Sequence, residues 1–321
     1  MINTQIFCTL GPSSLNKKFL SYAKGKVNLL RLNMSHLSLK KLEKNIKYIK
    51  KYSNIPICID TEGAQIRTKV KKKKYYKKNS KIEISKNKNF CLYPDNIFDI
   101  LKKGDILDIG FEDLKIKIKS KNQFKIVAKT ISAGLLETNK GVHIKNREIN
   151  LDFLTKKDKE AIKIGKKLLI KNYALSFVNT TSDIEKFNKI LKKENKIFKI
   201  ETSKSIKNLK SIINTGSKFL IDRGDLSKEV GIENIPFIQR RILKLANKKN
   251  KDVFIATNFL ESMINKKFPT RAEVNDIYNS VELGASGVVL AAETAIGNYP
   301  IECVKLLKKI FKNFKRLNKT N

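Results

Sequence analysis

The 321-residue sequence lacks tryptophan and contains only four cysteines, eight arginines and few acidic side chains. No stretch approaches the roughly 18 uninterrupted apolar residues of a membrane helix, which excludes an integral helical membrane protein. The cysteines show neither CxxC spacing nor a paired framework, so we expect reduced thiols. The sequence begins without a basic segment and a long apolar core and ends without a lipidation signal, so we expect an unprocessed, cytoplasmic protein.

The shortage of acidic residues leaves a large positive charge. Lys and Arg number 68 against 30 Asp and Glu, a formal charge of +38, which suggests nucleic acid, an anionic membrane surface or anionic substrates. Sixty of the 68 are lysines spread along the whole chain, whereas a nucleic-acid surface is expected to use more arginine and to concentrate its charge. Isoleucine and asparagine are abundant, so we favour drift in an A+T-rich coding sequence and do not expect a nucleic-acid partner.

Short apolar runs alternate with amphipathic stretches, a pattern typical of parallel strands joined by helices. The runs cover residues 6–11, 27–34, 57–60, 173–178, 197–201, 219–222, 253–258 and 287–293. The expected helices cover residues 36–51, 156–169, 183–194, 203–215, 234–248, 271–283 and 300–316, with Thr155, Ser182 and Thr202 as N-caps and Pro300 opening the last. An open doubly wound sheet would give the same local pattern, but eight runs favour a closed (β/α)8 TIM barrel.

The segment between the third and fourth runs differs from the rest. It alternates with period two and contains turn residues, which predicts a small antiparallel β-domain. We therefore expect a barrel of residues 1–68 and 150–321 and an inserted, β-barrel-like domain of residues 69–149. An insertion after strand three lies at the carboxyl end of the barrel, where a lid is the natural hypothesis and an ornament without a catalytic part is the alternative.

The carboxyl ends of the expected strands, where barrel active sites lie, are rich in residues that can bind or catalyse through side chain or backbone. These residues are Arg31, Asn33, Ser35, His36, Asp60, Thr61, Arg67, Lys199, Glu201, Arg223, Gly224, Asp225, Thr257, Asn258 and Glu293. The carboxylates of Glu201 and Asp225 suit a hard divalent cation such as Mg²⁺. Arg31, Arg67 and Lys199 would face a phosphate, and together these groups indicate phosphoryl transfer.

Eight motifs occur together in one order: TQIFCTLGPSS, VNLLRLNMSH, IDTEGAQIRT, FKIE, DRGDLSKEV, ATNFLESMI, PTRAEVNDIYNSV and AAETAIGNYP. In order and spacing the chain resembles the pyruvate kinase family over nearly its whole length, as a catalytic barrel with a lid domain. The resemblance implies phosphoryl transfer from phosphoenolpyruvate to ADP, giving pyruvate and ATP, the last step of glycolysis.

The resemblance also implies roles for individual residues. Lys199, Thr257 and Arg31 match catalytic positions, and Gly224 and Asp225 join them in binding phosphoenolpyruvate. Glu201 and Asp225 match the Mg²⁺ or Mn²⁺ ligands, Asn33, Ser35, Asp60 and Thr61 match the K⁺ site, and His36, Arg67 and Lys140 match nucleotide contacts. From the residues alone, His36 is equally well a helix-start residue and Lys140 a solvated turn. Arg271 and Glu273 match an intersubunit region or simply begin a helix.

Some positions depart from the family pattern. Gln65 replaces a residue that is commonly Glu in K⁺-dependent members and Lys in independent ones, so K⁺ is an expected but open cofactor. Asp222 stands where Ala is usual and adds a negative charge near the metal site. Asn258 replaces a usual Gln, and Ala291 and Ala292 replace a Ser-Gly pair whose hydroxyl is proposed to relay a proton.

Full-length family members continue into a C-terminal allosteric domain that we expect to be absent here, together with its effector regulation. We expect a homodimer through the barrel rather than a tetramer. The alternative function is a catalytically decayed barrel repurposed to bind RNA or another polyanion, for which KKKKYYKK (71–78) is the best support. We favour the interpretation that this lysine-rich segment is a solvated surface of the lid. A third hypothesis, that the chain is a different barrel enzyme that uses phosphoenolpyruvate, ranks below the other two.

Overall fold

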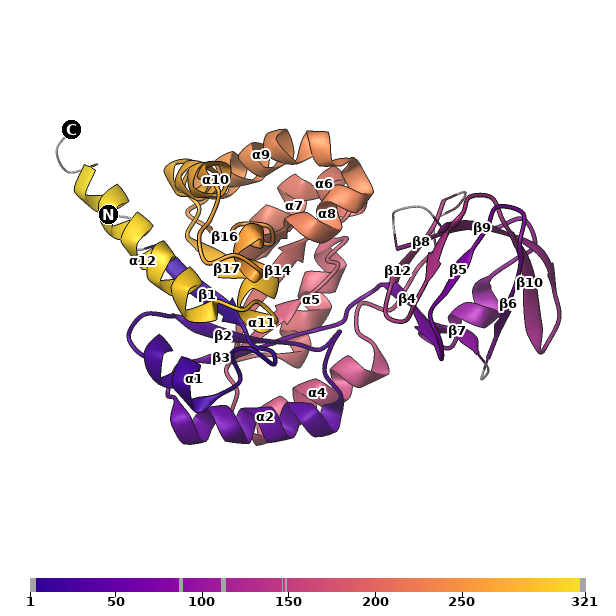
Figure 1. Ribbon diagram of the computed structural model, residues 1–321, viewed down its shortest axis with the longest axis horizontal. Helices are drawn as coiled ribbons and strands as arrows, with labels where there is room; N and C mark the ends of the chain where they lie inside the picture. The colour runs from indigo at the N-terminus through magenta and orange to yellow at the C-terminus, as the bar shows by residue number, and fades with distance from the viewer. Residues whose placement is uncertain (1–3, 87–88, 111–113, 146, 148, 318–321) are drawn as a thin grey trace. The chain divides into compact units, whose positions relative to one another are not determined.

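The computed structural model describes residues 4–86, 89–110, 114–145, 147 and 149–317. The chain divides into two compact units (Figure 1). The larger unit contains Met1–Gly63 and Lys156–Asn321, and the smaller unit contains Ala64–Thr155. Both sections of the larger unit are needed for its sheet, because the smaller unit is inserted between the third and fourth of its strands.

The larger unit is a closed barrel of eight parallel strands in the order β1-β17-β16-β15-β14-β13-β3-β2. The barrel closes because β1 pairs with both β2 and β17. The strands are β1 (Gln5–Thr9), β2 (Leu29–Asn33), β3 (Ile57–Asp60), β13 (Asn172–Leu175), β14 (Asn195–Ile200), β15 (Lys218–Asp222), β16 (Asp252–Ala256) and β17 (Gly287–Leu290). Each of the eight predicted runs overlaps one of them, with strand starts within two residues of the run, and the predicted (β/α)8 barrel is confirmed.

Helices connect these strands and surround the barrel (Figure 1). They are α1 (Lys17–Ala23), α2 (Leu39–Tyr52), α4 (Lys156–Lys167), α5 (Thr181–Ile190), α6 (Ser203–Lys207), α7 (Leu209–Thr215), α8 (Arg223–Val230), α9 (Ile235–Asn247), α10 (Arg271–Glu282), α11 (Ala292–Ala295) and α12 (Pro300–Leu317), with 3-10 turns at Ile232–Asn234 and Glu261–Ile264. Thr202 caps α6 and Pro300 opens α12, as predicted.

Four details of the helix prediction differ from the structure. Ser182 is not an N-cap, because α5 begins earlier, with a capping box between Thr180 and Asp183. The helix expected from residue 36 begins at Leu39 after the cap Ser38, so His36 is not a helix-start residue. The short helices α1 and α8 were not expected, and the stretch 203–215 forms two helices that meet at Asn208.

The barrel interior is filled by one layer of mostly apolar side chains from every strand. The layer consists of Phe7, Leu29, Cys58, Ala174, Ile197, Leu220, Phe254, Ala256 and Val289, and the rings of Phe7 and Phe254 stack with centroids 4.3 Å apart. This layer makes the barrel a packed core rather than a pore, as in other barrels of this class. Polar chemistry is therefore confined to the next layer, at the carboxyl ends of the strands.

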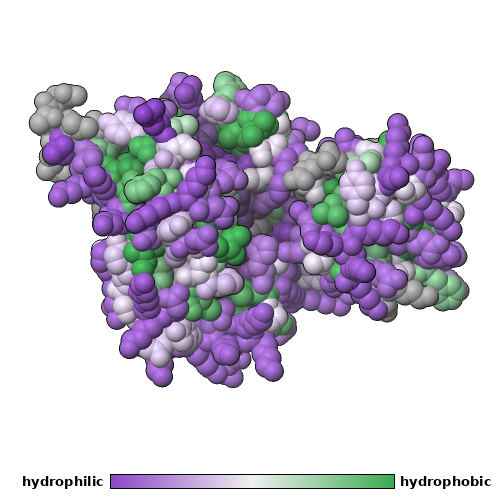
Figure 2. Space-filling view, in the orientation of Figure 1, coloured by the Kyte–Doolittle hydropathy of each residue, from purple (hydrophilic) through white to green (hydrophobic). Residues whose placement is uncertain are grey.

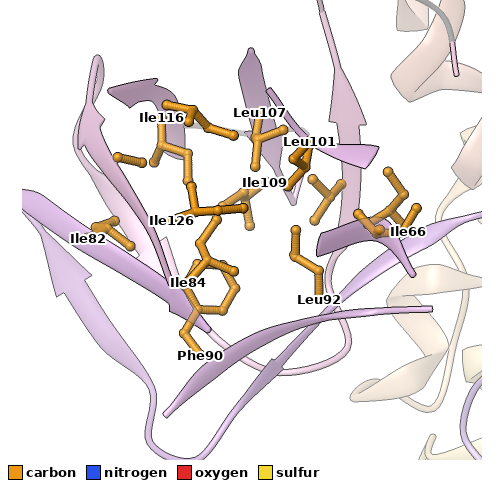
Figure 3. Close-up of a cluster of buried hydrophobic side chains, with 14 of the residues drawn as sticks. Ile66, Ile82, Ile84, Phe90, Leu92, Leu101, Leu107, Ile109, Ile116 and Ile126 are labelled. Carbon is orange, nitrogen blue, oxygen red and sulfur yellow. The ribbon is translucent and has the colours of Figure 1, made fainter. Parts of the chain in front are cut away.

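The smaller unit is antiparallel, as the alternating pattern predicts. Its larger sheet has the order β6-β10-β9-β8-β12-β4-β7, and β11 pairs with β5. The elements are β4 (Ile66–Val70), β5 (Lys74–Tyr76), β6 (Lys81–Ser85), β7 (Phe90–Tyr93), α3 (Ile97–Ile100), β8 (Ile106–Ile109), β9 (Leu114–Lys121), β10 (Lys125–Thr130), β11 (Gly134–Leu136) and β12 (Gly141–Ile144). Alternate residues of these strands, such as Ile84, Ile109 and Ile126, point toward one another in a separate core (Figure 3).

The lysines lie mainly on the surface. Hydrophilic side chains cover most of the face shown in Figure 2, and all six lysines of KKKKYYKK are exposed around β5. Among the described residues, no helix is both long enough and apolar enough to cross a membrane.

Candidate active site at the carboxyl rim of the barrel

The side chains of the candidate site form the layer above the apolar core of the barrel. Residues two apart on a strand point to the same side, so each core residue predicts the next inward-facing position. Counting two residues onward from the core positions of six strands gives Thr9, Arg31, Asp60, Ser176, Lys199 and Asp222. All six are polar and buried, whereas the layer below them is almost entirely apolar. The carboxyl rim of the barrel is therefore a ring of converging polar groups.

Arg31 is fixed by two neighbouring strands. Its Nε donates to Asp60 Oδ2 at 2.8 Å, a second guanidinium nitrogen also pairs with Asp60, and Nη1 donates to Thr9 Oγ1 at 2.9 Å. Asp60 Oδ1 in turn accepts from Ser176 Oγ at 3.2 Å. These contacts hold the guanidinium in one orientation before any ligand binds, which reduces the entropy that binding an anion would cost.

Lys199 stands at the centre of the ring and is 4% exposed. Its Nζ lies 3.0 Å from Glu201 Oε2, 3.2 Å from Asp222 Oδ2, 3.6 Å from Asp60 Oδ2 and 3.2 Å from Ser176 Oγ. Burial alone lowers the pKa of Lys199, but the three carboxylates outweigh it and raise that pKa above its ordinary value. This upward shift favours the charged ammonium form of Lys199.

Three carboxylates meet beside Lys199. One oxygen from each of Glu201, Asp222 and Asp225 lies within 4.8 Å of the others, the only such group of potential metal ligands in the described part of the chain. Glu201 is fully buried, and its Oε1 accepts from the Phe177 amide at 2.6 Å. Its Oε2 accepts no hydrogen bond from the residues that the structure describes and meets Lys199 as an ion pair at 3.0 Å. Burial, helped by neighbouring carboxylates and opposed by Lys199, raises the pKa of Glu201 to about 8. Clustered oxygen ligands, one with an unsatisfied lone pair, fit a hard divalent cation.

Asp222 was expected to add charge near the site but was not predicted as one of its ligands. Burial raises the pKa of Asp222, but Lys199 and Arg31 lower it further, so the net shift is downward and the side chain is ionised. A sequence signal was available: Asp222 follows the core residue Leu220 by two positions on β15, just as Lys199 follows Ile197 on β14. The same reasoning finds Thr9 and Ser176, which the motif comparison did not single out.

Thr257 and Gly224 face each other across the ends of β15 and β16. The Gly224 amide donates to Thr257 Oγ1 at 2.8 Å, and that hydroxyl donates to the Ala256 carbonyl at 2.6 Å. Thr257 and Asn258 have φ values of 73° and 57°, a left-handed conformation that is strained for a β-branched residue such as Thr257.

Arg223 holds this strained turn in place. Its Nε and Nη2 both donate to the Thr257 carbonyl, at 3.1 and 2.6 Å. Its Nη1 donates to Asp276 at 2.7 Å, and the guanidinium lies 4.1 Å from the centroid of the Phe259 ring. Arg223 therefore acts on the position of Thr257 through the backbone rather than by pointing at the ring of polar groups.

The four residues matched to a K⁺ site lie on the adjacent ends of β2 and β3. Asn33 is paired in register with Asp60, and Asn33 Oδ1 accepts from the Ser35 amide at 3.0 Å. The Thr61 carbonyl accepts from Ser176 Oγ at 2.7 Å. All of these are oxygen groups, the ligand type that hard cations prefer.

The remaining candidates are separated between the two units. His36 is exposed and lies between β2 and α2 in the larger unit. Arg67, on β4, and Lys140, whose Nζ lies 2.8 Å from Glu137, belong to the smaller unit together with the buried Gln65. The structure thus brings together Arg31, Asp60, Lys199 and the carboxylate group within the barrel.

Glu293 and Glu273 have structural contacts. Glu293 is buried, and its carboxylate accepts from the amides of Leu260 (3.2 Å) and Ala291 (2.7 Å). Glu273 is the third residue of α10 and forms a capping box with Thr270, so PTRAE begins a helix in this chain.

A barrel whose carboxyl rim carries a fixed lysine, a fixed arginine and a group of carboxylates has the features of a cation-dependent enzyme acting on a phosphorylated substrate. The family model described as pyruvate kinase, barrel domain, matches residues 1–304. The chain therefore belongs to the pyruvate kinase family, as its motifs predicted.

Individual relatives agree with this assignment. The chain is 36% identical to a pyruvate kinase of Methanocaldococcus jannaschii over 318 residues, covering 97% of this chain and 69% of the relative. It is 32% identical to a pyruvate kinase of Thermotoga maritima, covering 97% of this chain and 71% of the relative. It is also 32% identical to the chloroplastic pyruvate kinase isozyme G of Nicotiana tabacum, covering 95% of this chain but 57% of the relative. The chain thus spans between 57 and 71% of the length of these three relatives.

Proposed function

We propose that this chain transfers the phosphoryl group of phosphoenolpyruvate to ADP, producing pyruvate and ATP. The observation that carries the proposal is the buried Lys199, fixed beside Arg31 and a group of carboxylates on one rim of the barrel. Phosphoryl transfer requires mainly positioning and neutralisation of charge, and these residues supply both.

In the proposed reaction, the bond between phosphorus and the enol oxygen of phosphoenolpyruvate breaks while a β-phosphate oxygen of ADP bonds to phosphorus. Lys199 and Arg31 bind the migrating phosphoryl group, and their positions are set in advance by carboxylates and hydroxyls. The amides of Gly224 and Asp225 bind the substrate carboxylate. The Gly224 amide donates to Thr257 Oγ1 in the structure, so a carboxylate bound there would lie beside this hydroxyl. We propose that Thr257 holds the proton that the enolate gains at its terminal carbon.

The carboxylates of Glu201 and Asp225 would hold the divalent cation, Mg²⁺ or Mn²⁺. The unsatisfied Glu201 Oε2 and the all-oxygen ligand set fit such an ion. When bound, the ion supplies positive charge that offsets the charge on the phosphoryl oxygens.

Further roles are proposed from the family resemblance. Asn33, Ser35, Asp60 and Thr61 are proposed K⁺ ligands, and His36, Arg67 and Lys140 are proposed nucleotide contacts. The smaller unit is the proposed lid, whose role would be to exclude water and so favour transfer to ADP over hydrolysis. In the described part of the chain, Cys8, Cys58 and Cys303 form no disulfide, which fits the proposed cytoplasmic location. For the oligomeric state we propose a dimer through the barrel unit, which light scattering after size-exclusion chromatography would test.

An assay of ATP and pyruvate formation from phosphoenolpyruvate, ADP and Mg²⁺ tests the function. Turnover is expected with the chain as it stands, and parallel reactions with KCl and with NaCl measure the K⁺ requirement that Gln65 leaves open. No turnover with either salt would refute the proposal. Salt-sensitive RNA binding without turnover would favour the polyanion-binding alternative.

A further inference from the structure

Asp222 is the excess negative charge of the buried cluster. The buried ionisable groups in contact at the rim are two cations, Arg31 and Lys199, and three carboxylates, Asp60, Glu201 and Asp222. Without Asp222, two carboxylates would balance two cations. With it, the fully ionised cluster, which is the form that would bind a cation, carries one negative charge more than positive, and the partly buried Asp225, paired with Lys228 at 3.1 Å, lies at its edge. A buried excess charge is costly unless a counterion offsets it.

The backbone offers Asp222 a different role that its side chain does not take. Asp222 is the N-cap residue of α8, a position at which Asp ordinarily accepts a hydrogen bond from an amide of the first turn. Here no such bond forms. The carboxylate turns to the cluster instead: Oδ2 lies 3.2 Å from Lys199 Nζ, and an oxygen of Asp222 lies within 4.8 Å of oxygens of Glu201 and Asp225.

A second observation points to a cation at this place. Glu201 is fully buried, and its Oε2 accepts no hydrogen bond within the described part of the chain, although its Oε1 does. This oxygen meets Lys199 Nζ at 3.0 Å as an ion pair, and a carboxylate oxygen has a further lone pair that can bind a cation held by the ligand group formed with Asp222 and Asp225. The available lone pair and the excess charge therefore lie at the same point.

We propose that Asp222 is a third carboxylate ligand of the divalent cation, beside Glu201 and Asp225, and that it strengthens cation binding before any substrate is present. Affinity for hard cations rises with the number of charged ligands. The aspartate replaces a residue that is usually alanine, so the proposal distinguishes this chain from the family pattern. It deepens the proposed function and rests on it, because the cation is the one that the phosphoryl transfer would use.

The test measures binding of Mn²⁺ alone, with no substrate, from the electron paramagnetic resonance signal of the free ion. Asp222→Asn, which keeps the shape and removes the charge, is expected to raise the Kd for Mn²⁺ on the order of tenfold or more. Asp222→Ala serves as a second variant, since alanine is the usual residue. The matched control is Asp252→Asn, which removes one negative charge from the far end of β16, where Asp252 pairs with Lys218 at 3.6 Å. Its Kd is expected to stay within about twofold of the unmodified chain.

A thermal unfolding measurement in EDTA separates a ligand from a structural partner of Lys199. Asp222→Asn removes one ion pair of Lys199 but leaves Asp60 and Glu201 as its partners, so the metal-free variant should unfold within about 4 °C of the unmodified chain. Unchanged Mn²⁺ affinity in both Asp222 variants would overturn the proposal. Weaker Mn²⁺ binding accompanied by a melting temperature in EDTA lower by about 10 °C or more would also overturn it, because the carboxylate would then act mainly by holding Lys199.

The two proposals fail in different ways. An unmodified chain that forms no ATP would refute the proposed function, whereas the Mn²⁺ titration would still report on Asp222. An active chain whose Mn²⁺ affinity is the same with and without the Asp222 carboxylate would refute this inference alone.

Discussion

Replacing Arg223 should disturb the site without removing any group that faces it. The guanidinium makes two hydrogen bonds to the Thr257 carbonyl and lies 4.1 Å from the Phe259 ring. Hydrogen bonds from a charged donor contribute about 1.5–3 kcal/mol, and a cation over an aromatic ring about 1 kcal/mol. At the low end these contacts amount to about 4 kcal/mol, and release of the left-handed strain at Thr257 and Asn258 offsets about 1 kcal/mol, so Arg223→Ala should lower the free energy of unfolding by about 3 kcal/mol.

Arg223→Ala should also lower the turnover number, because it changes the position of Thr257 in the site. Once Arg223 is lost, the turn at Thr257 can relax, and a displacement of about 1 Å in a positioned group can cost on the order of 100-fold in rate. We expect kcat to fall by about that factor. Lysine at position 223 should give an intermediate result, because an ammonium group cannot reproduce the planar two-donor contact.

The assay is urea unfolding followed by circular dichroism, a suitable probe because the chain has no tryptophan and its helices, apart from α3, lie in the larger unit. Asp276→Asn is the control. It removes the partly exposed partner of Arg223 Nη1 but leaves both bonds to Thr257, and it should cost less than about 1 kcal/mol. An Arg223→Ala protein within 0.5 kcal/mol of the unmodified chain, a threshold well below the roughly 3 kcal/mol expected, would refute the reasoning, as would equal losses in the two variants.

Three other predictions concern single residues. Lys199→Met should reduce ATP formation by roughly a thousandfold. It should also destabilise the metal-free chain by about 3 kcal/mol, because it leaves the buried carboxylates of Glu201 and Asp222 without Lys199 as their partner. In thermal unfolding, added Mg²⁺ should restore part of that stability. Burial raises the pKa of Glu273, but hydrogen bonds from Ser262 and Thr270 lower it below its ordinary value. The ionised Glu273 carboxylate should therefore stabilise the fold at pH values above the unfolded-state pKa of about 4.3, and this stabilisation should be lost as pH falls through the folded-state pKa. Glu273→Gln should lower the free energy of unfolding by about 1 kcal/mol at pH 7, and the difference between the two proteins should shrink below pH 4. Gly287→Ala should cost about 2 kcal/mol in urea unfolding, because a Cβ there would lie 2.5 Å from the Gln5 carbonyl oxygen where β1 and β17 close the barrel.

The barrel could be predicted because its signal is repeated. Each strand is buried on both sides and reads as a short apolar run, and eight runs separated by helix-length stretches leave few alternatives. The errors fall at helix ends, where single hydrogen bonds decide: Thr180 rather than Ser182 pairs with Asp183. Helix α8 was missed because its sequence, RGDLSKEV, has little amphipathic pattern and follows a strand directly.

The site could be predicted in part, and the reason lies in how it is built. Lys199, Glu201 and Asp225 follow from motifs and from the chemistry of their side chains. Asp222, Ser176 and Thr9 are ordinary residues in the sequence, and only the register of the barrel shows that they point inward. Their importance comes from what surrounds them, which a motif does not record.

One contact described by the structure bears on how the chain folds. Asp158 accepts hydrogen bonds from the Glu62 and Gly63 amides, at 2.7 and 3.1 Å, across 96 and 95 residues of sequence. Closing a flexible loop of that length costs roughly 2 kcal/mol more conformational entropy than closing one of about ten residues. The smaller unit can remove that penalty by folding first, since Ile66 and Arg67 at its start pair with Val142 and Gly141 near its end. The barrel would then assemble after the smaller unit has folded and brought its own two ends close together. The smaller unit would fold before the larger one, although the larger unit contains most of the chain.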